Sequence, residues 1–363
     1  MCGRDPAVAP RKLADVELLN VWDYERAAAE KLEPGAYGYY AGGAGDEATL
    51  RDNVEAYSRW QLRPRVLVDV EDCTTATTVL GHELSMPLIV APVAFQRVAH
   101  PDGEVGMGRA AHGAGTAMCL STLATTGPAE LATTGVTRFF QLYVFRDQGL
   151  TRDLVARAKE AGFTALFLTV DTPVVSRRER DHRTGFTIPE HITVAAFGSG
   201  GMTPQGAFSV MSASVTWPDV EWLAAESGLP VVLKGVFTAE DAELACAHGA
   251  AGVVVSNHGG RQLDGVAASI DALPQVADAI DGRIEVLVDG GIRRGTDVVK
   301  ALALGARAVL AGRAPLWGLV VDGEAGARNV LDLLAAEIRN ALQLVGAASP
   351  ADVTRSHVAR RGG

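Results

Sequence analysis

The feature that most constrains the fold of this chain is a recurring alternation of short apolar runs with helix-like stretches. Each apolar run is bounded by Gly, Pro or charged residues. Continuous runs of four or five apolar residues are typical of strands that are buried on both faces, as in parallel sheets. We therefore predict strands over 87–91, 117–120, 138–142, 165–169, 231–233, 252–255, 285–288 and 308–311.

Strands that alternate with helices in this way predict an α/β fold, and eight such units are the number that closes a (β/α)8 TIM barrel. Helix signals lie between the strands. Thr238 is placed to cap a helix after the fifth strand, and a helix over 296–304 is followed by Gly305 as a C-cap. The region from 87 to 346 also has about the length typical of this barrel, roughly 250 residues.

Two segments fall outside the repeating pattern. Residues 1–86 are expected to form an N-terminal helical segment that packs on the barrel as a lid or plug, with a helix over 13–29 that Pro34 and Gly35 break. Residues 87–363 then form the barrel and a C-terminal helix, so that the whole chain is one domain.

The second segment, 171–230, follows the fourth strand and is too long for an ordinary barrel loop. Its centre, the Gly-Ser-Gly-Gly run at 198–201, predicts a mobile or partly disordered excursion. Because it would extend over the mouth of the barrel, we expect it to act as a lid.

Charge and cysteine usage exclude several classes of function. The formal net charge is -10 and no long Lys/Arg run occurs, so no nucleic-acid partner is expected. The four cysteines are scattered without a C-x-x-C pair, which predicts neither a disulfide framework nor a metal site. Residues 1–11 lack the apolar core of a signal peptide and no long apolar span follows, so we predict a cytoplasmic protein without a membrane partner.

Polar or turn-forming residues follow nearly every predicted strand. Because barrel enzymes place their sites at the carboxyl ends of the strands, these residues are expected to meet. One histidine in such a turn would be equally consistent with a polar capping turn, but the complete set favours a site. In chain order the set is Pro92, Val93, Ala94, Ser121, Gln141, Tyr143, Thr169, Asp171, Lys234, Ser256, His258, Arg261, Asp289, Gly290, Gly291, Arg293, Gly312 and Arg313.

The chemistry of these residues indicates a phosphorylated ligand and an acidic substrate. Exposed backbone N–H groups at 289–293 and 312–313, with two guanidiniums, suit a phosphate after the final two strands. Lys234 offers a fixed cation to an electron-rich ring. His258 can move a proton near neutral pH, and Arg261 has the planar fork that matches a carboxylate. Gln141, Thr169 and Ser256 are neutral donors and acceptors suited to the edges of a heterocycle.

The motifs that contain these residues resemble the FMN-dependent (S)-2-hydroxy acid oxidase and dehydrogenase family, which includes glycolate oxidase, lactate oxidase, mandelate dehydrogenase and flavocytochrome b2. The matching segments are Gln-Leu-Tyr at 141–143, Leu-Thr-Val-Asp-Thr-Pro at 168–173, Lys-Gly-Val at 234–236, Ser-Asn-His-Gly at 256–259, Asp-Gly-Gly-Ile-Arg-Arg-Gly at 289–295 and Ala-Leu-Ala-Leu-Gly-Ala at 301–306. The resemblance extends from about Tyr37 to His357.

The resemblance implies a role for each matching residue. His258 would be the catalytic base, and Asp171 would hydrogen-bond it and stabilise the imidazolium. Arg178, Arg261 and Tyr39 would hold the substrate carboxylate. By the same resemblance, Tyr143 would hydrogen-bond the 2-hydroxyl. The flavin would be held by Val93, Ala94, Ser121, Gln141, Thr169, Lys234 and Ser256, and its phosphate by Gly291, Arg293, Gly312 and Arg313. Pro92, Asp289 and Gly290 would also belong to the FMN site.

One departure from the family pattern bears on the substrate. Leu123 lies in the run Ser-Thr-Leu-Ala-Thr at 121–125, where glycolate oxidases carry a Trp. The smaller side chain predicts room for a bulkier, mandelate-like 2-hydroxy acid. We therefore expect oxidation of such an acid to its 2-keto acid, with dioxygen as the final acceptor and hydrogen peroxide as the second product.

Several alternatives remain open at this level. The acceptor could be a quinone or a cytochrome, the enzyme could be a monooxygenase, and hydride and carbanion routes are not distinguished. A flavin barrel such as the type 2 isopentenyl diphosphate isomerase would not need the carboxylate site, and a non-catalytic flavin-binding protein would not need His258 and Asp171. Family members commonly form tetramers or octamers, so a homo-oligomer, with the homotetramer as our assignment, is expected by resemblance.

Overall fold

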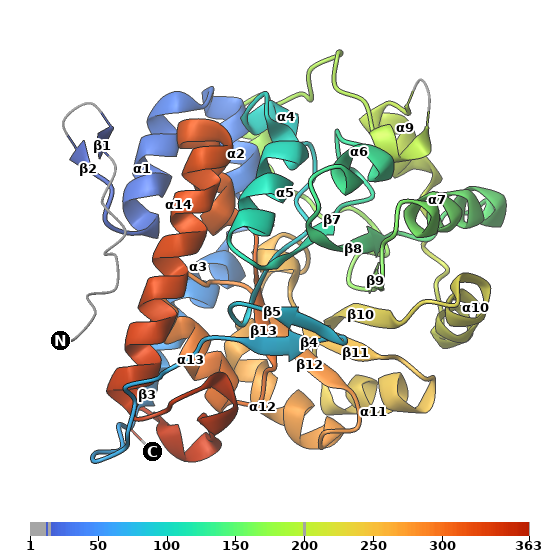
Figure 1. Cartoon of the computed structure of the whole chain (residues 1–363). Coiled ribbons are helices and arrows are strands. Elements are labelled where there is room, and N and C mark those ends of the chain that lie inside the picture. Colours follow the sequence, from blue (N-terminus) through green and yellow to red (C-terminus); the bar gives the residue numbers. More distant parts are fainter. Residues whose placement is uncertain (1–11, 14–15, 199–200, 363) are drawn as a thin grey trace.

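The computed structural model describes residues 12–13, 16–198 and 201–362, and a closed barrel of eight parallel strands forms its centre (Figure 1). Each strand pairs with its neighbours in chain order, and the last pairs with the first. The strands are β6 (Leu88–Val90), β7 (Ala117–Leu120), β8 (Thr137–Leu142), β9 (Leu166–Thr169), β10 (Val231–Val236), β11 (Gly252–Val255), β12 (Glu285–Asp289) and β13 (Ala308–Ala311). The predicted TIM barrel is confirmed, and only β10 differs from its predicted bounds by more than one residue.

Both faces of the barrel sheet are buried, which explains the continuous apolar runs in the sequence. Val254 belongs to the cluster that fills the barrel interior, whereas its neighbours Val253 and Val255 belong to the shell between the sheet and the helices. Successive side chains of a strand point to opposite faces. Positions of such a strand away from its ends are therefore apolar on both faces, and strict alternation is lost.

Helices surround the barrel. They are α4 (Gln96–Ala99), α5 (Gly103–Gly113), α6 (Pro128–Ala132), α7 (Gln148–Glu160), α11 (Ala239–Ala247), α12 (Ser269–Ile280), α13 (Gly295–Ala303) and α14 (Arg313–Val345). Thr238 caps α11, as predicted, by accepting a hydrogen bond from the backbone N–H of Asp241. The helix predicted over 296–304 is α13, and Gly305 follows it with φ +109°. α14 is interrupted by non-helical backbone at Asp322 and Gly323.

The N-terminal segment is less helical than predicted. It contains β1 (Lys12–Leu13), β2 (Val16–Glu17), α1 (Val21–Lys31), α2 (Pro34–Ala41), α3 (Ala48–Glu55), the 3-10 turn η1 (Ala56–Arg59), β3 (Trp60–Leu62), β4 (Thr77–Val79) and β5 (His82–Leu84). The helix predicted over 13–29 is wrong in its first half because Asn20 and Asp23 form a capping box that begins the helix at Val21. Pro34 does not only break that helix but begins α2.

The hairpin of β4 and β5 closes the amino-terminal end of the barrel. Its side chains Val79 and Leu84 join the interior cluster, and the Leu80 N–H donates to the carboxylate of Glu285 at the start of β12. The helices α1 and α2 lie instead against α14 and the site end of the barrel (Figure 1). The bottom of the barrel is thus sealed, and ligands have access to the carboxyl ends of the strands.

The excursion after β9 is more regular than predicted. Its described residues form α8 (Glu179–Arg183), the 3-10 turn η2 (Ala195–Phe197), α9 (Pro204–Val210) and α10 (Trp217–Ser227). α10 packs on α7 and β10, in the place of the barrel helix that follows β9. Residues 199–200, the centre of the predicted Gly-Ser-Gly-Gly lid, lie outside the described part of the chain.

The C-terminal region returns to the N-terminal segment. After α14 come the 3-10 turns η4 (Pro350–Asp352) and η5 (Arg355–His357), and then β14 (Val358–Arg360), which pairs antiparallel with β3. A further 3-10 turn, η3 (His258–Gly260), follows β11. Among the helices that the structure describes, none combines the length and the apolar character needed to cross a membrane.

Candidate functional site

A cavity opens at the carboxyl ends of the barrel strands and brings most of the predicted site residues together. From the predicted set it is lined by Tyr39, Pro92, Val93, Ala94, Ser121, Leu123, Gln141, Tyr143, Thr169, Arg178, Lys234, His258, Arg261, Asp289, Gly290, Gly291, Arg293, Gly312 and Arg313. Asp171 and Ser256 are not among the lining residues. They lie behind the wall and contact His258 and Lys234, which do line it.

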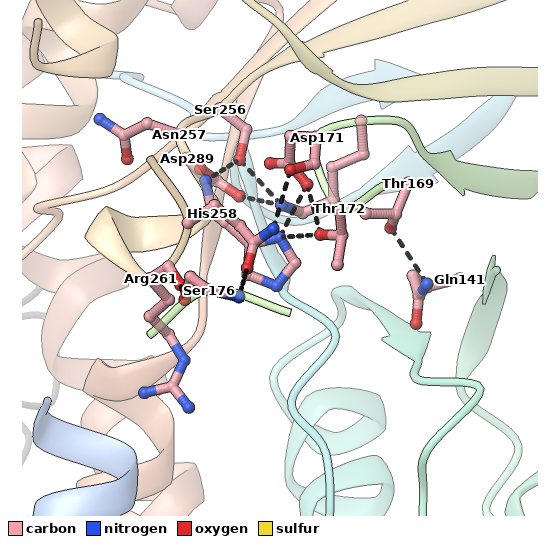
Figure 2. A network of polar contacts seen from close by, with 12 residues as sticks. Gln141, Thr169, Asp171, Thr172, Ser176, Ser256, Asn257, His258, Arg261 and Asp289 are labelled. Atoms are coloured by element: carbon pink, nitrogen blue, oxygen red, sulfur yellow. Dashed lines mark hydrogen bonds and ion pairs between the residues drawn. The ribbon is translucent and has the colours of Figure 1, made fainter. Parts of the chain in front are cut away.

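The imidazole of His258 is held by a carboxylate. Its Nδ1 lies 2.8 Å from Oδ1 of Asp171 (Figure 2). The hydroxyl of Thr172 donates to the same carboxylate oxygen at 2.9 Å and lies 3.3 Å from Nδ1. Burial raises the pKa of Asp171, but the attraction of His258, its hydrogen bond and the charge of Lys234 outweigh burial, so the net shift is downward. The pair is therefore arranged to hold a positive charge on the imidazole.

Two backbone features fix this pair. β10 has a register shift between Lys234 and Val236, and Gly235 between them has φ +115°. A Cβ at Gly235 would lie 2.6 Å from the Cβ of Asp171, so only glycine lets the carboxylate approach β10 this closely. His258 itself has φ +58°, a left-handed conformation that is uncommon for a non-glycine residue and is often found at functional sites.

Arginines line the side of the cavity next to His258. Arg261 stacks its guanidinium over the ring of Tyr39, 4.9 Å from the centroid, and donates to the carbonyls of Tyr39 and Gly42. Burial and the nearby charge of Arg178 lower the pKa of Arg261 to about 10. Within the described chain, the buried Nε of Arg178 has no hydrogen-bond partner. Two half-buried, mutually repelling guanidiniums with an unused donor suit an anion.

Tyr143 completes this side of the cavity. Burial raises its pKa well above the usual range, and the charge of Asp171 raises it further, while Arg178 and Arg261 act in the opposite direction. The phenol is therefore protonated at neutral pH and available as a hydrogen-bond donor.

A second group of cationic side chains lines the cavity, and one of them, Arg313, donates to the same Gly42 carbonyl as Arg261. Arg313 and Arg293 line the cavity together with the backbone of Gly291 and Gly312. Burial, followed by repulsion from Arg261 and Arg293, lowers the pKa of Arg313 to about 9. Arg293 stacks over the ring of Trp22 at 5.2 Å, and its buried Nε lies 3.5 Å from the carboxylate of Glu25, an ion pair without a hydrogen bond among the described residues. Because these charges repel one another, a bound dianion such as a phosphate would relieve the repulsion.

The cavity also holds groups that suit the edge of a heterocycle. Lys234 is buried and ion-paired with Asp289 at 2.7 Å, and it donates to Ser256 at 2.9 Å. Burial lowers the pKa of Lys234, but the charges of Asp289 and Asp171 outweigh burial and the net shift is upward. The amide of Gln141 donates to the hydroxyl of Thr169 at 3.0 Å (Figure 2). A ring flanked by a cation and neutral donors, with a phosphate at one end, fits FMN.

The structure adds cavity residues that sequence reasoning missed. Among them are Tyr40, Thr172, Val175, Phe208 and Met211. Thr172 directly follows Asp171, so the strand-end argument could have included it. Phe208 and Met211 come from α9 and the residue after it, in the excursion, where no strand end marks them. The structure shows no group of His, Cys, Asp and Glu side chains, within its described ranges, that could hold a metal ion.

Comparisons with known proteins agree with this geometry. The family model described as FMN-dependent dehydrogenase matches residues 28–360. Glycolate oxidase 3 of Arabidopsis thaliana is 48% identical over 355 residues, which cover 94% of this chain and 96% of that relative. L-lactate oxidase of Nostoc sp. is 48% identical over 354 residues, 93% of this chain and 97% of that relative. A solved structure of mandelate oxidase with benzoyl-formic acid has a TM-score of 0.88 at 43% identity, covering 95% of this chain and 98% of that one.

Proposed function

Because this chain belongs to the FMN-dependent dehydrogenase family and is an FMN-dependent oxidoreductase of the 2-hydroxy acid oxidase type, we propose that it oxidises an (S)-2-hydroxy acid with a bulky, mandelate-like side chain to the 2-keto acid. The observation that carries this proposal is the single cavity shared by His258, Arg178 and Arg261. It combines a proton acceptor with a carboxylate site, which are the two groups that a 2-hydroxy acid requires.

The arginines position the substrate. Arg178 and Arg261, with Tyr39 beside them, bind the carboxylate and thereby hold the α-carbon at a defined place in the cavity. Tyr143, which is protonated, donates to the 2-hydroxyl oxygen and stabilises the charge that develops there. When bound, FMN accepts the two electrons that leave the α-carbon.

His258 acts as the base through one particular nitrogen. Since the carboxylate of Asp171 is an acceptor, Nδ1 carries a proton and donates to it, and Nε2 presents its lone pair to the substrate. As Nε2 takes the substrate proton, the imidazole becomes positively charged. Asp171 stabilises that charge at 2.8 Å, so the proton is held while oxidation proceeds.

Arg261→Lys is expected to raise KM about 10- to 100-fold, because a charge-assisted hydrogen bond contributes about 1.5–3 kcal/mol and an ammonium cannot reproduce the planar fork. FMN affinity is expected to change far less. The measurements are steady-state kinetics with (S)-mandelate and a flavin fluorescence titration of the apoprotein. Equal loss of substrate and FMN affinity would contradict the assignment of Arg261 to the substrate carboxylate.

The walls of the cavity support a bulky substrate side chain. The cavity that His258 lines also has an apolar wall, formed by Leu123, Val175, Phe208 and Met211. The comparisons point to different acids, since relatives of higher identity are named glycolate and lactate oxidases and the structural neighbour is a mandelate oxidase. We give more weight to the residue at position 123, because it changes the volume of the cavity itself.

Leu123→Trp is expected to shift preference from mandelate towards glycolate. Filling the cavity with an indole removes room for a phenyl group, and overpacking of this kind typically costs about 1–3 kcal/mol, or roughly 10- to 100-fold in relative kcat/KM. The measurement is kcat/KM for both acids in wild type and variant. A wild-type protein that already prefers glycolate would refute the proposed substrate class.

One experiment tests the function as a whole. The purified protein is mixed anaerobically with a panel of 2-hydroxy acids, and loss of the yellow flavin absorbance is recorded. Oxygen is then admitted, and oxygen consumption and peroxide are measured. We propose dioxygen as the acceptor because the similar proteins are named oxidases. Bleaching without reoxidation by oxygen would indicate a quinone or cytochrome acceptor, and no bleaching would contradict the proposed oxidation.

A further inference from the structure

We propose that Asn53 is a positioning residue for the catalytic base, and that it acts through a reciprocal pair of amide hydrogen bonds with Asn257. The inference rests on the proposed role of His258. Asn53 lies on α3, in the N-terminal segment, and Asn257 follows β11 as the N-cap of η3, directly before His258. The two residues are distant in the sequence and both are buried.

The contact between the two amides is complete in both directions. Nδ2 of Asn53 donates to Oδ1 of Asn257 at 2.8 Å, and Nδ2 of Asn257 donates to Oδ1 of Asn53, also at 2.8 Å. Figure 2 shows the Asn257 side chain pointing away from the imidazole and from Asp171. Asn257 therefore does not face the substrate, and its effect on the reaction must pass through the backbone of the turn that follows.

That turn is unusual enough to need support. His258, Gly259 and Gly260 have φ values of +58°, +63° and +75°, so three consecutive residues are left-handed. Oδ1 of Asn257 also accepts from the N–H of Gly260 at 3.0 Å, and this bond spans the turn. Because a left-handed histidine persists only where its surroundings enforce it, the orientation of Asn257 controls the orientation of His258.

Asn53 in turn controls Asn257. Oδ1 of Asn53 accepts a further hydrogen bond from the N–H of Ser269 at 3.2 Å, which ties α3 to the start of α12. Nδ2 of Asn257 makes a second donation, to the carbonyl of Ala267 at 3.1 Å. The two side-chain amides thus differ in the hydrogen bonds that they donate: Asn53 donates one, whereas Asn257 donates two.

This asymmetry permits a sharp test. A neutral carboxylic acid has one O–H donor and one carbonyl acceptor, whereas a carboxylate has acceptors alone. Protonated Asp at position 53 can therefore reproduce every recorded hydrogen bond of Asn53. Ionised Asp at the same position would place its charge against Oδ1 of Asn257. Protonated Asp at position 257 can replace only one of the two donations.

Charged and titratable groups around α3 define the surroundings of this substitution. Asp52 on α3 and Asp271 on α12 are both ion-paired with Arg59. Asp264 accepts from the backbone at the start of α3, and Tyr57 of η1 donates to the carbonyl of Gly290. His258 follows Asn257 in the turn, Arg313 donates to the carbonyl of Gly259, and Asp289 is paired with Lys234. In the described chain, the recorded partners of the Asn53 side chain are Asn257 and Ser269 alone.

The experiment compares Asn53→Ala, Asn53→Asp and Asn257→Asp with wild type, and uses Asn340→Asp, an exposed position on α14, as a matched control. The rate of anaerobic flavin reduction by saturating (S)-mandelate is measured from about pH 5 to pH 8, a range in which a buried carboxyl can titrate. Asn53→Ala should lower the rate about 10²-fold, the effect of misplacing a reacting group by about 1 Å. FMN affinity should stay unchanged.

The pH dependence separates positioning from general loss of structure. The rate of Asn53→Asp relative to wild type should rise as pH falls, while Asn257→Asp should recover only in part and Asn340→Asp should match wild type throughout. The pairing is also supported if Asn53→Asp reduces its flavin at the wild-type rate at every pH while Asn53→Ala reduces it more slowly. A deficit of Asn53→Asp that is the same at all pH values, or a wild-type rate in Asn53→Ala, would overturn it. No bleaching in wild type would instead contradict the proposed function.

Discussion

The His258→Ala variant is expected to keep its bound FMN and yellow colour but to reduce the flavin about 10²–10⁴-fold more slowly with a 2-hydroxy acid, the range that a general base typically contributes. Removing the imidazole takes away the acceptor for the substrate proton. The arginines, Tyr143 and the phosphate end of the cavity stay in place, so binding should persist. The measurement is anaerobic stopped-flow reduction with (S)-mandelate.

The control for this variant is His191→Ala, which removes an exposed histidine from the excursion after β9. It should reduce its flavin at the wild-type rate. If His258→Ala were reduced as fast as wild type, the assignment of the base would be wrong. Loss of FMN from His258→Ala would instead show that the imidazole supports the fold of the site and not the proton transfer alone.

The second large effect is expected from Gly291→Ala, which should lose FMN affinity and destabilise the protein. A Cβ at Gly291 would lie 1.9 Å from the carbonyl oxygen of Asn53, and the residue has φ +81°. Backbone strain typically costs about 1–3 kcal/mol of folding free energy. Overpacking typically costs about 1–3 kcal/mol more. The clash is with backbone, which cannot rotate away, so α3 and the β12–α13 loop must separate at the proposed phosphate site.

The matched control is Gly81→Ala, in the turn between β4 and β5. Gly81 has φ +80°, almost the same conformation, but a Cβ there would meet no atom within 4 Å. This variant should show the backbone strain alone and keep wild-type FMN affinity. The measurements are the melting temperature and the FMN dissociation constant of both proteins. Similar behaviour of the two variants would contradict the steric argument at position 291.

The barrel could be predicted because each of its strands carries its own evidence. A strand such as Gly252–Val255 is buried on both faces, and a strand of this kind has a continuous apolar run in its own sequence. The N-terminal segment is different. Leu13 and the residues after it have apolar character that also suits a helix, whereas the capping box at Asn20 and Asp23 begins α1 at Val21.

The candidate site was predictable to the same extent as the strands. His258, Lys234 and Gly291 could be placed because they follow predicted strands, and strand ends of a barrel converge. Phe208 and Met211 could not, since they belong to α9 and the residue after it, and their position depends on how the excursion folds back. The bridge between Phe145 and Met211 that fixes this position is a contact between distant parts of the chain.

The sequence by itself determined the barrel, the family and most of the polar groups that line the cavity, because strand burial and strand-end chemistry are local properties of the chain. Only the tertiary structure decided which side chains support those groups from behind. Asp171 approaches β10 because Gly235 leaves room for it, and Asn53 meets Asn257 because α3 packs beside η3. Such contacts join residues that are distant along the chain, and no local pattern of hydrophobicity or charge encodes them.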